Sequence, residues 1–185
     1  MSAIASAATV LVLAVSVWPA AAQQNRERPR GVVENCATQS GADFPGAFTR
    51  PINLVVGPLA LEGAAGTPQF VWDSAANVGF QKFPALVRQG HRVTVELSRQ
   101  TRRAGAGLAY GPLPGGETHL RDAHRVVTFI ACRSGSGSTA DGRPVTFWSG
   151  SVLARSPRCV PLLVWIDGRR TPRRAVIHLG VSSCG

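Results

Sequence analysis

Apolar residues recur at every second position through much of the chain after residue 50, and this alternation constrains the fold more than any other feature. In residues 92–98, Val93, Val95 and Leu97 alternate with polar residues. Successive side chains of a strand point to opposite faces, so the pattern predicts a strand with one buried face and one face in water. No segment shows the spacing of a buried helix face, and we therefore expect an all-β protein without helices.

We expect about nine strands, separated by turns rich in Gly, Pro, Asp and Ser. The clearest hairpin spans residues 159–181, where Asp167 and Gly168 supply the turn because Gly accepts positive φ. The loop at 134–142, SGSGSTADG, is expected to be flexible. Short strands with regular turns are typical of a sandwich of two sheets. The other expected strands cover residues 52–61 (broken at Gly57 and Pro58), 69–72, 82–88, 92–98, 107–110, 126–131 and 145–153.

Two stretches of the sequence resemble known exported domains. Residues 84–97, PALVRQGHRVTVEL, resemble a strand–turn–strand element of immunoglobulin-like bacterial domains. The C-terminal third contains VTFIAC, FWSGSVLA and RCVPLLVWIDGR before a last strand that closes on Cys184, and this order resembles a set of exported bacterial proteins. The resemblance implies an immunoglobulin-like antiparallel β-sandwich of about seven to nine strands, and it brings no activity with it.

An apolar run at residues 3–22 precedes the expected domain and ends at Pro19 followed by three alanines. It resembles a secretory signal peptide, for which we expect cleavage after Ala22. An uncleaved membrane anchor is the alternative, because twenty such residues nearly span a bilayer. We therefore expect a signal peptide at residues 1–22, a disordered leader at 23–35 and a secreted or extracytoplasmic β-sandwich domain at 36–185.

Four cysteines, an even number, indicate two disulfides in an exported chain: Cys36, Cys132, Cys159 and Cys184. Zinc sites usually draw their ligands from close pairs such as C-x-x-C, and no such pair exists, so we expect neither a metal nor another cofactor. Four cysteines allow three pairings. We favour Cys132–Cys159, which would join the end of one strand to the start of another, with Cys36–Cys184, which would tie together the two ends of the domain.

The chain is strongly basic, with 20 Lys and Arg against 10 Asp and Glu and a formal net charge of +10. Lys82 is the only lysine, and arginine offers a planar fork of donors to phosphate or carboxylate. Codon usage in a GC-rich genome is the better explanation of the excess of Arg over Lys, but it leaves the net charge unchanged. We therefore expect an anionic partner, either a cell-envelope polymer or a membrane surface. Nucleic acid is not expected outside the cell.

The final hairpin carries the candidate anion-binding residues, Arg169, Arg170, Arg173 and Arg174. The alternative is that these charges solvate the turn and keep the sheet edge from pairing with other chains. A second basic group follows the strand at 92–98 and consists of Arg99, Arg102 and Arg103.

A catalytic alternative rests on His119, Asp122 and His124, which lie within six residues. A histidine with an orienting carboxylate is the usual general base of a hydrolase. Positions 119 and 124 would face opposite ways in a strand, so such a site requires a loop. The nucleophile motif G-x-S-x-G is absent from the sequence. A solvated loop accounts for these residues more simply than a small secreted hydrolase does.

Tryptophan is the remaining candidate for ligand binding, at Trp72, Trp148 and Trp165. An exposed indole stacks on sugar rings, whereas most Trp side chains in strands pack in the core. The sequence as a whole predicts a secreted, non-catalytic β-sandwich that serves as a binding or structural module of the cell envelope.

Overall fold

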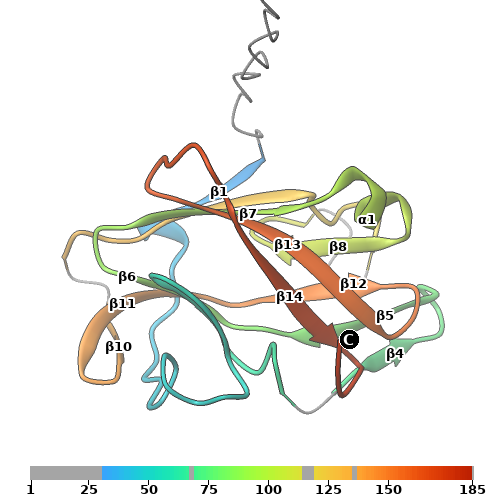
Figure 1. Cartoon of the computed structure of the whole chain (residues 1–185), viewed down its shortest axis with the longest axis horizontal. Coiled ribbons are helices and arrows are strands. Elements are labelled where there is room, and N and C mark those ends of the chain that lie inside the picture. The colour runs from blue at the N-terminus through green and yellow to red at the C-terminus, as the bar shows by residue number, and fades with distance from the viewer. Residues whose placement is uncertain (1–30, 67–68, 114–118, 135–136, 185) are drawn as a thin grey trace, which may run out of the picture.

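The structure is a computed structural model that describes residues 31–66, 69–113, 119–134 and 137–184 (Figure 1). The predicted signal peptide, residues 1–22, and residues 23–30 of the predicted leader lie outside the described residues. The described part contains fourteen strands, one short α-helix and one 3₁₀ turn, η1 (Cys36–Thr38). The prediction of an all-β protein is confirmed.

The strands form three sheets. Sheet A consists, in spatial order, of β1 (Val32–Glu34), β9 (Val126–Ile130), β7 (Arg92–Leu97), β13 (Arg158–Ile166) and β14 (Arg173–Leu179). Sheet B consists of β10 (Ser138–Ala140), β11 (Arg143–Trp148), β6 (Ala85–Arg88), β3 (Leu59–Leu61) and β2 (Leu54–Val56). Sheet C consists of β4 (Val71–Asp73), β5 (Val78–Lys82), β12 (Gly150–Ala154) and β8 (Ala106–Tyr110).

Sheets B and C are two parts of one bent layer. Strand β5 continues into β6 after Phe83 and Pro84, and β11 continues into β12 after Ser149. The N–H of Phe83 donates to the carbonyl of Gly150 at the bend, at 2.9 Å. Two long segments, β5–β6 and β11–β12, therefore run from one sheet to the other, and in Figure 1 these four strands run below β7 of sheet A.

The core lies between sheet A and this bent layer, which makes the fold a β-sandwich. Val95 and Phe129 of sheet A, Trp148 of sheet B and Tyr110 of sheet C belong to one cluster and are at most 2% exposed. The Phe129 ring centroid lies 5.2 Å from those of both Tyr110 and Trp148. The Tyr110 hydroxyl donates to the carbonyl of Phe83 at 2.6 Å, and burial raises the pKa of this phenol.

The outer face of β7 differs from the prediction. Thr94 was expected in water, but it is 8% exposed and its hydroxyl bonds to that of Thr128 at 2.8 Å. Glu96 is half-buried and accepts hydrogen bonds from Arg125 at 2.5 Å and from the Trp165 indole at 3.1 Å. Polar residues of the alternating pattern thus bond to partners on neighbouring strands.

Four local predictions need correction. Helix α1 (Arg99–Arg103) was not expected, and it begins where the Ser98 hydroxyl accepts from the N–H of Thr101. Strand β1 lies in the predicted leader, so the ordered domain begins before residue 36. Strand β10 lies in the loop predicted to be flexible. The described strands number fourteen rather than seven to nine, because bends and turns divide longer segments and β1, β5 and β10 were not expected.

All four cysteines form disulfides, as predicted, but the favoured pairing is wrong: the bonds are Cys36–Cys132 and Cys159–Cys184. Strands β9 and β13 both pair antiparallel with β7, so they run in the same direction. The end of β9, at Cys132, and the start of β13, at Cys159, therefore lie at opposite ends of sheet A. The unexpected strand β1 runs parallel to β9, and this pairing brings Cys36 beside Cys132.

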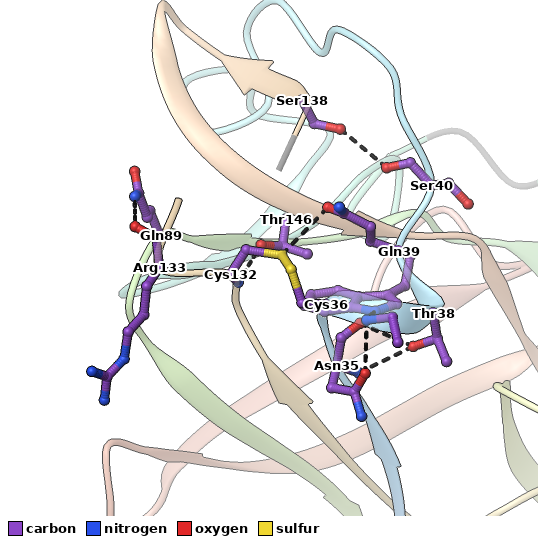
Figure 2. The surroundings of a disulfide bond; sticks show 12 residues. Asn35, Cys36, Thr38, Gln39, Ser40, Gln89, Cys132, Arg133, Ser138 and Thr146 are labelled. Atoms are coloured by element: carbon purple, nitrogen blue, oxygen red, sulfur yellow. Dashed lines mark hydrogen bonds between the residues drawn. A yellow bond between two sulfur atoms is a disulfide. The ribbon is translucent and has the colours of Figure 1, made fainter. Parts of the chain in front are cut away.

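Hydrogen bonds surround the Cys36–Cys132 disulfide (Figure 2). The Asn35 side chain accepts from the N–H of Ala37 at 2.8 Å, and the N–H of Cys132 donates to the Thr146 hydroxyl at 2.7 Å. Next to them, the N–H of Ser40 donates to the carbonyl of Phe147 in sheet B, at 2.9 Å. The segment after β1 thus crosses from sheet A to sheet B. Two disulfides are compatible with an oxidising environment.

Candidate functional site

The candidate anion site lies on the hairpin that joins β13 to β14. Asp167 and Gly168 have φ of 45° and 78°, and the N–H of Arg169 donates to the carbonyl of Ile166 at 2.9 Å. Positive φ at both central residues is the geometry that fits the twist of paired strands, and Gly and Asp adopt it readily. The predicted turn is therefore confirmed.

Asp167 clamps this turn to the start of β7. Its Oδ2 lies 2.7 Å from Nδ1 of His91, and its Oδ1 accepts from the N–H of Arg92 at 2.9 Å. Burial acts to raise the pKa of the Asp167 carboxyl, but the hydrogen bonds from Arg92 and His91 and the charges of His91 and Arg169 outweigh it and lower the pKa. The N–H of Asp167 also donates to the carbonyl of Arg92, at 2.8 Å. Asp167 therefore holds the turn through hydrogen bonds of both its side chain and its backbone.

The four predicted arginines are all exposed. Arg169 and Arg170 lie in the turn region. Arg173 lies over Gly57, and its Nη1 is 3.2 Å from the position that a Cβ atom on Gly57 would occupy. Arg174 pairs with Leu163 in the ladder, which places it on the outer face of sheet A. Across the described ranges, no ion pair within 4.0 Å joins any of these guanidinium groups to a carboxylate. We name Arg169, Arg170, Arg173 and Arg174 the tip arginines.

Arg92 adds a fifth exposed charge beside the turn, and sequence reasoning missed it. Its backbone bonds to Asp167, although the two residues are 75 positions apart. Only the pairing of β7 with β13 brings them together, so no local sequence signal marks Arg92 as part of the site.

One member of the second basic group, Arg102, has a structural role, whereas Arg99 and Arg103 are exposed. Nη2 of Arg102 donates to the carbonyls of Leu120 at 2.8 Å and Ala123 at 3.1 Å, and burial lowers the pKa of this guanidinium. Nearby, Nη1 of Arg158 donates to the carbonyl of Ala104 at 2.5 Å. These donors bind the backbone of the same chain. A cavity of about 410 Å³ opens beside them and is lined by Ser98, Gln100, Thr101, Ala104, Arg158, Cys159 and Pro161.

The candidate catalytic residues lie in the turn-rich segment before β9, and His119 Nδ1, Asp122 Oδ2 and His124 Nε2 are buried without a hydrogen-bond partner among the described residues. His124 bonds through its backbone to Leu108, with both hydrogen bonds at 2.8 Å, and Oδ2 of Asp122 lies 3.6 Å from Nε of Arg121. In the part of the chain that the structure describes, no hydrogen bond joins the side chains of His119, Asp122 and His124 to one another. Nor do three or more His, Cys, Asp or Glu residues there form a group that could hold a metal.

The three tryptophans divide into two kinds. Trp148 is 1% exposed and Trp165 is 6% exposed, so both are packed. Trp72 is 47% exposed on the edge strand β4, with its ring centroid 6.3 Å from that of Phe70. Of the three candidates for sugar stacking, Trp72 alone is accessible.

No protein-family model matches the chain, and no curated protein matches it. Among the described helices, none has the length and apolar character needed to cross a membrane.

Proposed function

We propose that this protein is a secreted, non-catalytic β-sandwich module that associates with the cell envelope and binds anionic surfaces. The observation that carries the proposal is the set of tip arginines, which are exposed and have no carboxylate partner among the described residues. Guanidinium donors that the protein itself does not use are available to phosphate or carboxylate oxygens. The turn beneath them is clamped by Asp167, so little order has to be gained on binding.

Secretion and an immunoglobulin-like strand arrangement are parts of this proposal. Secretion is supported by the apolar run before Pro19 and by the two disulfides. The immunoglobulin-like arrangement is supported by the two packed layers and by the resemblance of residues 84–97, which hold the turn between β6 and β7. Mass spectrometry of the protein from its host tests secretion, because an intact Met1 would contradict cleavage after Ala22.

Retention on immobilised polyphosphate, measured as salt is raised, tests the binding function. We expect the wild-type protein to be retained at low salt and released as salt screens the charges. Replacing all four tip arginines by Ala removes the contacts, so this variant should elute near the void volume.

A matched control removes the same number of charges elsewhere. Arg99, Arg103, Arg121 and Arg155 are exposed residues away from the tip, and their replacement by Ala lowers the net charge equally. This control should elute close to the wild type. Equal losses of retention in the two variants would mean that net charge, rather than the tip, governs binding.

A further inference from the structure

The outer face of sheet A differs from the outer faces of sheets B and C. Phe44 and Phe48 pack over sheet B, and Leu113 and Leu120 pack over sheet C. Among the described residues, no comparable apolar cluster forms on the outer face of sheet A. We name this outer face of sheet A the open face; Thr94, Thr128 and Trp165 at its centre are at most 8% exposed, so its exposed side chains lie along its margins.

Two aliphatic side chains are exposed on this open face. Val33 of β1 is 44% exposed and Ile130 of β9 is 37% exposed. The ladder pairs Val33 with Thr128, and it pairs Ile130 with Arg92. Paired residues share a face of a sheet, so both aliphatic side chains stand on the side that Arg92 occupies.

The charges on the open face are predominantly positive. Its carboxylates are already paired, since Glu96 binds Arg125 and Asp167 binds His91. Arg92 and Arg174 have no carboxylate within 4.0 Å among the described residues, and Arg169 and Arg170 lie at the adjoining tip. The face thus combines exposed aliphatic groups with guanidinium groups that are available to a ligand.

We infer that the open face of sheet A docks onto a lipid bilayer that contains anionic headgroups. This inference rests on the proposed function and specifies its partner, a membrane rather than a soluble polymer. The arginines bind headgroup phosphates, while Val33 and Ile130 leave water for the boundary between headgroups and acyl chains. A hydrated polymer offers the arginines the same phosphate chemistry but gives the aliphatic side chains no apolar environment.

Cosedimentation with phosphatidylcholine vesicles, with and without phosphatidylglycerol, tests the inference. The test variant carries Val33→Thr and Ile130→Thr, which keep β-branching and remove apolar contact area. The control is Val71→Thr, because Val71 is 53% exposed on the edge strand β4 of sheet C. We expect the double variant to bind phosphatidylglycerol vesicles about tenfold more weakly than wild type, and the control to stay within about twofold.

Polyphosphate in solution separates the failure of this inference from the failure of the proposed function. The double variant should bind polyphosphate as the wild type does, because its arginines are intact. Membrane docking would be overturned if the double variant bound vesicles as tightly as the wild-type protein does. It would also be overturned if the wild-type protein bound polyphosphate but not vesicles. Failure of the wild type to bind either partner would overturn the proposed function as well.

A second measurement covers the case in which the double variant does not fold. The wild-type protein is mixed with phosphatidylglycerol vesicles that carry a spin-labelled lipid, and methyl signals are followed by NMR. Docking predicts that the label broadens the signals of Val33 and Ile130 more than those of Val71. Equal broadening at the three residues would contradict docking through the open face.

Discussion

The two ends of the sandwich each combine arginines with a disulfide, yet they use the arginines differently. The tip end holds the turn at Asp167, the tip arginines and the Cys36–Cys132 bond. The α1 end holds helix α1, Arg102, Arg158 and the Cys159–Cys184 bond. At the α1 end, guanidinium groups donate to backbone carbonyls of the chain. At the tip end the arginines are exposed to solvent. Arg173 and Arg174 pair across the sheet with the apolar residues Val164 and Leu163.

This contrast teaches that clusters of arginine in a sequence do not by themselves identify a binding site. Arg102 and Arg170 are the same residue type in similarly basic segments. They differ in whether carbonyl groups of the chain lie within reach, and the fold decides this. An arginine that bonds to the backbone contributes to stability, whereas an exposed arginine without a partner is available to a ligand.

The largest expected effects come from the disulfides, one at each end. The Cys36–Cys132 bond closes a separation of 96 residues and the Cys159–Cys184 bond one of 25. Loop closure restricts the unfolded chain more for the longer loop, so replacing each pair by Ser should cost about 4.5 and about 3.5 kcal/mol, respectively. Urea denaturation of the two double variants measures both costs. A larger loss for the shorter loop would contradict the comparison.

Arg102→Ala tests the structural role assigned to the α1 end. It removes the hydrogen bonds to the carbonyls of Leu120 and Ala123, so we expect a loss of about 2 kcal/mol in the free energy of unfolding. The matched change at the tip end is Arg170→Ala, which should alter stability by less than about 0.5 kcal/mol. Thermal melting compares the two variants. Similar losses would show that the two ends do not differ in this way.

The third variant, Asp167→Asn, tests whether the Asp167 carboxylate stabilises the turn at the tip end. Of the three tests, it has the smallest expected effect on the free energy of unfolding. Asn tolerates the positive φ at this position, so the change removes the charge and keeps the turn. Because the pKa of Asp167 is lowered in the folded protein, its contribution is present above its ordinary pKa and is lost as pH falls through the lowered value.

The exposure of this pair limits that contribution to less than about 1 kcal/mol. Stability of the wild type should therefore decline more steeply below about pH 4 than stability of the Asn variant. Urea midpoints measured across this acidic range check the difference. Parallel curves would mean that the Asp167 carboxylate does not stabilise the turn.

Local patterns predicted the elements whose side chains alternate. Val93, Val95 and Leu97 face the core as expected, and the turn at Asp167 and Gly168 has the predicted geometry. These features depend on neighbours in the chain, which a sequence displays directly. Strand β1 has three residues and no alternation long enough to detect, so its parallel pairing with β9 was missed.

Long-range pairing decided the features that the sequence did not reveal. The disulfide pairing depends on β1 lying beside β9, and Arg92 joins the tip through the pairing of β7 with β13. The separate roles of Arg102 and the tip arginines depend on carbonyl groups that the fold brings near. The composition predicted a basic protein, but only the three-dimensional arrangement distinguishes arginines that hold the fold together from those that extend into solvent.

The most direct test of the account is the salt dependence of polyphosphate binding, measured by titration for the wild type and the two fourfold arginine variants. Each contact with a charged polymer releases counterions, so the slope of log affinity against log salt reports the number of contacts. We predict that replacing the tip arginines makes this slope shallower by about 3, while replacing Arg99, Arg103, Arg121 and Arg155 leaves it close to the wild-type value. Equal slopes for the two variants would contradict a binding site at the tip.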